Sequence, residues 1–310
     1  MPDGDVLSGS NAAFTVSADG DIFGSLPVTV STDAITVGNQ TISFDLVSQV
    51  GGRVGHYRAY DSAGATSGPA TEVHYFGQDD GYSYIQFGSW AKGVVSPNPG
   101  FRIGQDFGAF VAPYADTGLT PVSNLPAAGT ATWQGQYTGY VDKEGVGVSH
   151  VVGGAQILAS FGSSIFGVSA MGGDGDILLT LSPPDPNRSS FAVPPQDNCA
   201  IVCVSANYAD AVEITGLIEG NTFEGDVTAT RNIAGQAYPR GDSIRVFNSG
   251  FALTPGGVPP SPVGLYSHGR ANSGGMRGGF FGNRGGESGG TYYFTIGTTK
   301  AAGSFGGKLQ

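Results

Sequence analysis

Hydrophobic and polar residues alternate in short runs along most of the chain. In the clearest run, residues 130–141, Trp133, Tyr137 and Val141 fall on one side, whereas threonine and glutamine residues fill the other. This period of two is typical of a β-strand with one buried face. No window longer than about ten residues has the three-and-four spacing of an amphipathic helix. We therefore predict an all-β protein.

Similar patterns predict strands in both parts of the chain. In the first part they cover residues 13–17, 41–47, 53–60, 72–76, 82–90 and 107–111. In the second part they cover residues 130–141, 154–161, 165–170, 177–181, 212–217, 222–230, 263–266, 275–282, 290–295 and 302–308. Turn-forming residues at 78–81 and 219–221 predict two hairpins, one between 72–76 and 82–87 and one between 212–217 and 222–230.

A stretch rich in proline, alanine and glycine separates these two groups of strands. Pro113, Pro121 and Pro126 oppose regular strand pairing there, so we place a linker at residues 112–128. Residues 1–111 are then predicted to be a small β-rich domain. Residues 129–310 are predicted to close into an antiparallel β-barrel of eight strands or slightly more, since closure removes exposed strand edges.

Two long segments interrupt the predicted barrel, at residues 182–209 and 231–262. Connections of this length in a compact domain are functional or partly disordered, and the sequence leaves both alternatives open. The first holds Cys199 and Cys203, which are too few for a zinc or iron–sulfur site. We predict a local disulfide between them, with two free thiols as the alternative.

Composition narrows the class of protein. The chain of 310 residues has 53 glycines, 11% aromatic and 13% charged residues, which suits short strands and tight turns and differs from a disordered chain. A net charge of −11 with scattered basic residues argues against nucleic acid as a partner. The chain has no run of 18 apolar residues, so no transmembrane helix is predicted. Residues 1–4 do not begin an export signal, so we interpret that signal, or a lipid anchor, as absent from this sequence.

The C-terminal strands carry a recognisable series of motifs. It includes Gly-Gly-Phe-Phe-Gly at 278–282, Glu287, Gly-Gly-Thr-Tyr-Tyr-Phe at 289–294 and Gly-Ser-Phe-Gly-Gly at 303–307, with related segments at 129–135, 155–161 and 218–225. This series resembles the β-barrel domain of transferrin-binding protein B and its relatives. The resemblance covers residues 129–310 and departs from the family pattern at the turn Asn283–Gly286, where a Pro-Asn-Ala-Glu type of turn is usual.

The resemblance implies a binding protein, because the family includes surface lipoproteins that bind host iron proteins and secreted hemophores of the hemophilin type. One N-terminal domain followed by one barrel is similar to the hemophilin layout, which implies that residues 1–111 are a clamp-like or handle-like domain that binds the ligand. Heme iron needs a histidine or tyrosine ligand within an apolar pocket, and His74 and His56 are our axial-ligand candidates. A half-buried structural role is the alternative for each histidine. The candidate heme-pocket residues are Tyr75, Phe76, Tyr82, Tyr84, Phe87 and Trp90.

We therefore favour a bacterial protein, secreted or on the outer-membrane surface, that captures heme or another small apolar ligand for iron acquisition. An outer-membrane receptor is a further expected partner, and no metal beyond heme iron is expected. The alternative is a cofactor-free module that binds a host or environmental protein through barrel loops such as 182–209. A carbohydrate-acting enzyme is a third, more distant hypothesis. We expect no catalysis, because no Gly-x-Ser-x-Gly, His-Glu-x-x-His or P-loop motif is present.

Overall fold

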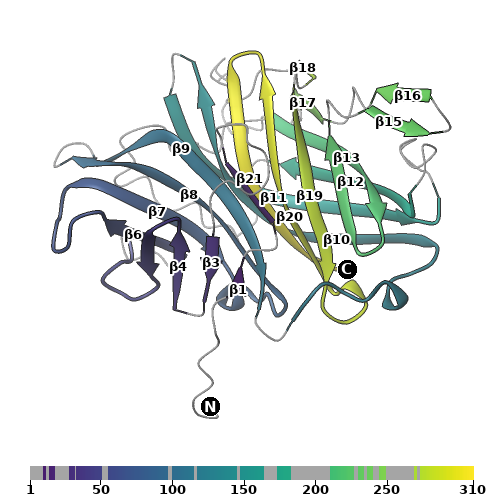
Figure 1. The fold of residues 1–310 in the computed structure, drawn as a ribbon, viewed down its shortest axis with the longest axis horizontal. Coiled ribbons are helices and arrows are strands. Elements are labelled where there is room, and N and C mark those ends of the chain that lie inside the picture. The colour runs from purple at the N-terminus through teal and green to yellow at the C-terminus, as the bar shows by residue number, and fades with distance from the viewer. Residues whose placement is uncertain are drawn as a thin grey trace, which may run out of the picture.

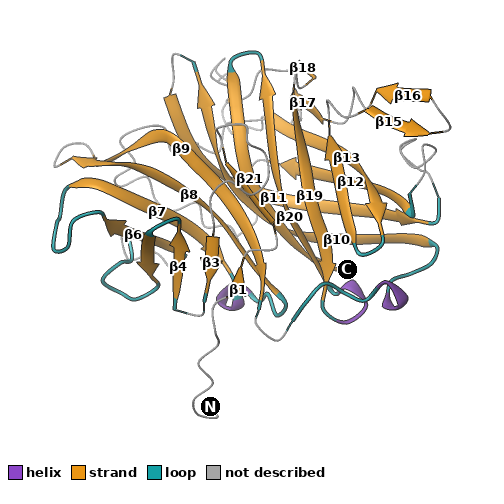
Figure 2. Ribbon diagram, viewed as in Figure 1, coloured by secondary structure: helices purple, strands orange, loops and turns teal. Residues whose placement is uncertain are grey.

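The computed structural model describes most of both predicted regions, and its ordered elements are almost entirely β-strands (Figures 1 and 2). The described residues are 10–11, 14–17, 28–31, 33–50, 55–96, 100–114, 117–144, 147–163, 173–182, 210–226, 230–233, 236–239, 244–248, 269–270 and 273–310. Three short 3₁₀ turns, η1 (Gln78–Asp80), η2 (Val122–Asn124) and η4 (Asn283–Gly285), are the helical elements among them. None of these helices is long and apolar enough to cross a membrane. The all-β prediction is confirmed.

The N-terminal part of the chain forms two antiparallel sheets, which we call the N-terminal sandwich. The first sheet has the strand order β1–β3–β4–β5, and the second has the order β2–β9–β8–β7–β6. The bounds of the first sheet are β1 Ser10–Asn11, β3 Val28–Val30, β4 Ala34–Val37 and β5 Gln40–Ser43. Those of the second are β2 Phe14–Ser17, β6 His56–Tyr60, β7 Gly68–Phe76, β8 Ile85–Ser96 and β9 Gly100–Pro113.

The C-terminal part closes into an antiparallel barrel of eight strands, as predicted. Going round the barrel the order is β10–β11–β12–β13–β14–β19–β20–β21, and β21 pairs with β10 to complete the ring. The bounds are β10 Gly129–Lys143, β11 Gly147–Phe161, β12 Gly175–Ser182, β13 Asp210–Glu219, β14 Thr222–Asp226, β19 Ser273–Phe281, β20 Glu287–Ile296 and β21 Thr299–Leu309. Strand β17 (Ile244–Asn248) extends the sheet beside β13 and pairs with β18 (Gly269–Arg270), whereas β15 (Thr230–Ile233) and β16 (Gln236–Pro239) pair with each other.

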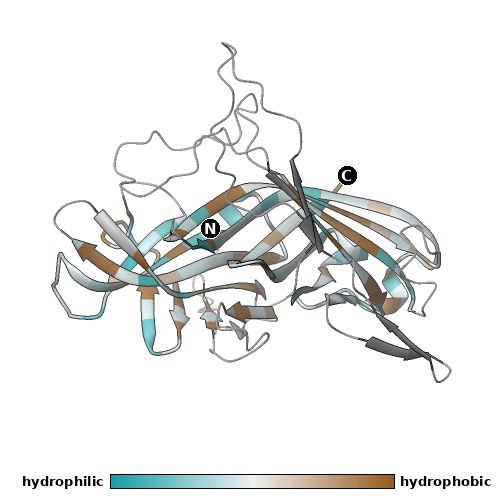
Figure 3. Ribbon diagram, turned by 90° about the horizontal axis from the view of Figure 1, so that it is seen from above, coloured by the Kyte–Doolittle hydropathy of each residue, from teal (hydrophilic) through white to brown (hydrophobic). Residues whose placement is uncertain are grey.

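Alternation along the strands explains where the two main cores lie. Figure 3 shows hydrophobic and hydrophilic residues interspersed along the strands. Trp133, Tyr137 and Val141 of β10 point into the barrel, where they pack with aromatic and aliphatic side chains from the other strands. This confirms the predicted buried face of residues 130–141. In the sandwich, Val73 and Trp90 from the second sheet pack against the aliphatic residues of the first.

The second sheet of the sandwich packs its other face on the outside of the barrel, and we call this contact the seam. Val16, Ala91 and Phe107 of the sheet are buried there against barrel residues that include Tyr140 and Tyr293. Farther along the seam, the Tyr82 hydroxyl donates to the Gly306 carbonyl at 3.1 Å. The sandwich and the barrel are thus joined by a packed, hydrogen-bonded face.

Hydrogen bonds hold the predicted linker against one end of the barrel. Its Thr120 donates from the backbone N–H to the Phe280 carbonyl at 2.7 Å and from its hydroxyl to the Gly282 carbonyl at 2.7 Å. Asn221, in the turn between β13 and β14, donates to the Thr120 carbonyl at 2.9 Å. Strand β9 continues to Pro113, into the predicted linker, and pairs there with Ile85.

Several strand predictions need correction or fall outside the described residues. Both predicted hairpins are confirmed, but the sequence missed β3 and β4, which are too short for a clear period. The strand predicted at 41–47 ends at Ser43 and the chain then turns. The strand predicted at 82–90 begins only at Ile85. Strands predicted at 165–170 and 263–266, like Cys199 and Cys203, lie outside the described residues.

Candidate functional site

The most concentrated group of chemically active side chains lies where β6 and β7 face the barrel. In the antiparallel register, His56 is opposite His74 and Arg58 is opposite Glu72. Residues two apart on a strand point to the same side, so all four side chains lie on the seam face of the sheet. Two strands of one rigid sheet therefore bring together two imidazoles, a carboxylate and a guanidinium.

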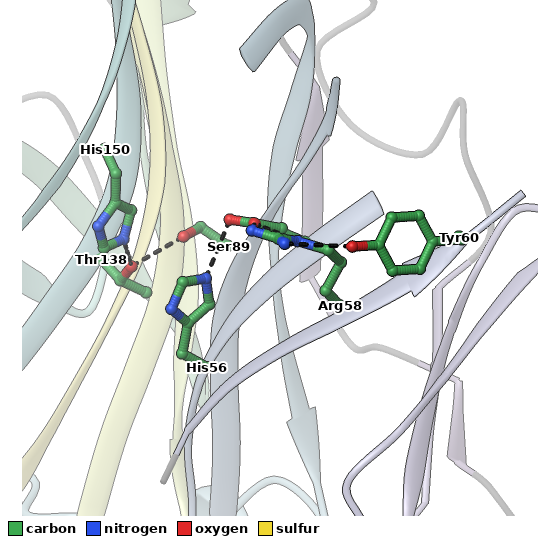
Figure 4. Close-up of polar contacts among 7 residues, drawn as sticks. His56, Arg58, Tyr60, Ser89, Thr138 and His150 are labelled. Atoms are coloured by element: carbon green, nitrogen blue, oxygen red, sulfur yellow. Dashed lines mark hydrogen bonds and ion pairs between the residues drawn. The ribbon is translucent and has the colours of Figure 1, made fainter. Parts of the chain in front are cut away.

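Glu72 is the centre of this group. Its carboxylate is nearly buried, and one oxygen, Oε2, lies 2.9 Å from His56 Nε2. The other oxygen, Oε1, accepts from Arg58 Nε at 2.6 Å and is also bonded by Arg58 Nη2. Arg58 in turn reaches the Tyr60 hydroxyl at 3.5 Å (Figure 4). A buried carboxylate requires such partners, because an unpaired charge there would be costly.

The histidines form a stack that crosses the seam. The ring centroids of His56 and His74 are 4.0 Å apart, and those of His74 and His150 are 3.5 Å apart with the rings nearly parallel. Whereas His56 and His74 belong to the sheet, His150 is on barrel strand β11. Its Nε2 lies 2.8 Å from the Thr138 hydroxyl, which is 2.8 Å from the hydroxyl of Ser89 on β8 (Figure 4). Polar contacts thus join the sheet to the barrel beside the stacked rings.

Burial sets the protonation of the groups on the barrel side. Burial and, secondarily, the nearby His56 lower the pKa of His150 to about 3, so its ring is neutral at physiological pH. Burial also raises the pKa of Tyr140 well above its usual value, with a further contribution from the charge of Glu72. The Tyr140 hydroxyl is buried without a hydrogen-bond partner among the described residues. The barrel side of the stack is therefore uncharged.

The depressed pKa of His150 predicts a pH-dependent stability. In the unfolded chain this ring binds a proton near pH 6.5, whereas the folded protein resists protonation down to about pH 3. The stability contributed by neutral His150 is therefore fully present above pH 6.5 and is lost as the pH falls toward 3, by at most about 1.4 kcal/mol per pH unit. Urea unfolding in buffer with a chelator gives the free energy of unfolding at each pH between 4.5 and 7. This free energy should rise less steeply with pH for His150→Gln than for the wild type. Identical slopes would contradict this assignment, because the carboxylates titrate in both proteins.

The structure brings together both predicted histidines but not the predicted aromatic residues around them. Tyr75 and Trp90 point to the opposite face of the sheet, into the sandwich core. Tyr82, Tyr84, Phe76 and Phe87 belong to a cluster farther along the seam, with Tyr82 and Phe87 fully buried. A porphyrin bound between the histidines would have to separate rings that are now stacked. Heme capture stays a prediction.

Sequence reasoning missed other members of the group for different reasons. Glu72 had a signal, because alternation places it on the face of His74, two residues away. The contribution of Arg58 follows only from the β6–β7 register. His150 and Thr138 have no local signal, since their approach depends on how the barrel docks against the sheet.

Comparison with known proteins agrees with the barrel topology. A model of the C-lobe and N-lobe β-barrels of transferrin-binding protein B matches residues 200–309. Over these residues, which hold strands β13 to β21, the barrel is similar to those of transferrin-binding protein B. This confirms the resemblance seen in the C-terminal motifs. None of the curated proteins matches the chain.

Solved structures of transferrin-binding protein B share the fold over nearly all of the chain. Intact Ap-TbpB, with its N and C lobes, has 14% identity and a TM-score of 0.51, and the match covers 97% of this chain and 46% of that one. The Tyr-167-Ala and Trp-176-Ala double mutant of the Haemophilus parasuis protein has 13% identity and a TM-score of 0.51, with 96% and 44% covered. The chain therefore spans less than half the length of these proteins. At such low identity, the likeness shows a shared fold and nothing more.

Proposed function

We propose that this protein is a surface-exposed or secreted binding protein that holds a folded partner protein through its N-terminal sandwich. The transferrin-binding protein B type of barrel supports a binding role, since the names of the similar structures state that they bind a protein. The observation that carries the proposal is an exposed apolar turn between β5 and β6. This turn favours a contact on the sandwich, whereas the sequence alone suggested the barrel loops.

Leu46 and Val47 are adjacent at this turn and are exposed to 85% and 93%. The other large hydrophobic residues exposed in the described part of the chain, Val94, Val122 and Leu309, are 43–56% exposed and are scattered. Scattered apolar residues are normal on a surface. Two neighbouring aliphatic side chains that are almost completely exposed have a cost in water, and contact with a partner would remove it.

The turn is held in shape by hydrogen bonds on both sides. The Ser48 N–H donates to the Asp45 carboxylate at 2.8 Å, which closes the turn around Leu46 and Val47. Farther on, the Arg58 N–H donates to the Ser48 carbonyl at 2.8 Å, so the segment after the turn lies along strand β6. A turn that is already ordered loses little conformational entropy on binding, which favours affinity.

Changing the turn should remove partner binding without unfolding the protein. The first probe is transferrin, iron-loaded and iron-free, because the similar structures carry its name. In biolayer interferometry we expect saturable binding by the wild type. Leu46→Asp combined with Val47→Asp should weaken it at least about 10-fold, as expected for central apolar contacts. Val122→Asp, on the linker, is the matched control and should bind like the wild type.

Heme capture is distinguished by a separate titration. Hemin added to the wild type, His74→Ala and His56→Ala should leave the spectrum of free hemin unchanged if the ligand is a protein. A saturable Soret band that disappears in one histidine variant, together with no binding of either transferrin form, would overturn the proposal in favour of the hemophore hypothesis. Transferrin binding that is unaffected by the double substitution would place the contact elsewhere on the molecule.

A further inference from the structure

We propose that His56, Glu72 and His74 form a binding site for a divalent transition-metal ion, of the class that includes Zn²⁺, Ni²⁺ and Cu²⁺. Each residue offers one donor atom, and these atoms all lie within 4.8 Å of one another. They come from adjacent strands in fixed register, so the sheet itself holds the set together. The site shares no residue with the turn at Leu46 and Val47, and metal binding there does not depend on a protein partner.

The distances suit an ion after a small adjustment of side chains. Metal bonds of about 2.0–2.2 Å to histidine nitrogen and carboxylate oxygen place neighbouring donors somewhat more than 3 Å apart. His56 Nε2 and Glu72 Oε2 are already 2.9 Å apart. His74, whose ring is stacked between those of His56 and His150, offers its donor atom within 4.8 Å of the donor atoms of the other two residues of the site.

The donor types select the kind of ion. Two imidazoles with one carboxylate suit zinc, copper and nickel, whereas magnesium and calcium prefer oxygen ligands throughout. Access is also provided, since the side chain of His56 is 16% exposed while that of Glu72 is 6% exposed. An ion can therefore reach the donors from solvent at the edge of the seam and then lie against a nearly buried carboxylate.

The positive charge of Arg58 beside the site weakens metal binding, so its removal distinguishes a metal site from a purely structural cluster. Its guanidinium is bonded to Oε1 of Glu72, which leaves Oε2, now paired with His56, as the oxygen for the metal. The positive charge beside the carboxylate lowers the affinity for a cation. Arg58→Gln should therefore bind the metal more tightly than the wild type. A purely structural role of the cluster predicts no such gain.

The test is calorimetric titration of the full chain, freed of metal by a chelator, with ZnCl₂ at pH 7.5. We expect one equivalent to bind, with no heat from MgCl₂. His74→Ala and His56→Ala should lose binding at least about 100-fold and Glu72→Gln about 10-fold. Glu219→Gln, which removes an exposed carboxylate, is the matched control and should leave the titration unchanged.

A second measurement keeps the test independent of variant folding. The electron paramagnetic resonance spectrum of the wild type with one equivalent of Cu²⁺ should show splitting from imidazole nitrogens. A spectrum without nitrogen splitting, the absence of any saturable metal binding, or binding unchanged in His74→Ala would overturn the proposal. Circular dichroism confirms that each variant compared in the titration is folded.

Discussion

Glu287→Ala is expected to lower the free energy of unfolding by about 3–5 kcal/mol, one of the two largest effects we predict. Glu287 begins barrel strand β20, and its side chain points into the seam, where only 4% of the residue is exposed. Its Oε1 accepts from the Ser83 N–H at 2.6 Å, and its Oε2 accepts from the N–H groups of Tyr84 and Ile85 at 2.9 and 3.0 Å. One carboxylate thus holds the chain where it enters β8.

The size of the effect follows from what the substitution leaves behind. Hydrogen bonds to a charged group contribute about 1.5–3 kcal/mol each, and they are not additive within one cluster. Without the carboxylate, the buried N–H of Ile85 and the partly buried N–H groups of Ser83 and Tyr84 lose their acceptor. Backbone donors buried without a partner are rare in folded proteins because they are costly. The loss therefore exceeds that of an ordinary surface contact.

Urea unfolding followed by circular dichroism measures this change. Glu287→Gln keeps the size of the side chain but removes its charge and one acceptor oxygen, so we expect an intermediate loss. Glu224→Gln is the matched control, because Glu224 is 46% exposed and its ion pair with Arg277 is long, at 3.7 Å. That variant should lie within about 0.5 kcal/mol of the wild type. Equal losses for Glu287→Ala and Glu224→Gln would refute the role of this carboxylate.

The barrel was predictable from the sequence because its signal is local and repeated. Alternation in residues 130–141 identified the buried face of β10, and the motifs from Gly278 to Gly307 identified the closing strands. The short strands β3 and β4 have too few residues for a clear period, so these two strands of the first sheet were missed, whereas the prediction at 41–47 overlaps β5. Leu46 and Val47 were assigned to a strand on their β-propensity, but the structure places them in an exposed turn.

The candidate site was predictable only in part. Alternation gives Glu72 and His74 a common face, because residues two apart on a strand point to the same side. The stacking of His150 on His74 joins two parts of the chain that are far apart in sequence, and it depends on how the sheet and the barrel dock. No pattern within either strand encodes that docking. Tyr75 was misleading because odd and even positions of one strand face different cores, whereas Phe76 and Phe87 face the seam but belong to a separate cluster farther along it.

The glycines of the C-terminal motifs have a second role that their sequence did not indicate. One role is to leave space for rings inside the barrel, as Gly278 does beside the Phe223 ring. Gly289 and Gly306 instead face outward, against Ile85 and Phe87 of the sandwich. On the outer wall, glycine lets the second sheet of the sandwich approach the barrel backbone closely. The same motif therefore serves both closure and docking.

Gly306→Ala is expected to lower the free energy of unfolding by about 2–3 kcal/mol, because it overpacks the seam. A Cβ atom at Gly306 would lie 2.4 Å from a carbon of the Phe87 ring, with two further ring carbons within 3.0 Å. Phe87 is fully buried and packs on Phe76 and Tyr82, so its ring has no free space to enter. The strain must then be taken up by the sheet or by the barrel wall.

Gly154→Ala provides a matched control with the opposite sign. Gly154 is also on a barrel strand, β11, but a Cβ there would meet nothing within 4 Å. Because alanine restricts the unfolded chain more than glycine does, this variant should be neutral or more stable by up to about 1 kcal/mol. Phe87→Leu should recover part of the loss caused by Gly306→Ala, and a double-mutant cycle in urea measures that coupling. If Gly306→Ala is as stable as Gly154→Ala, or if the cycle shows no coupling, the sheet does not approach the barrel at Gly306 closely enough for a Cβ atom to overpack the seam.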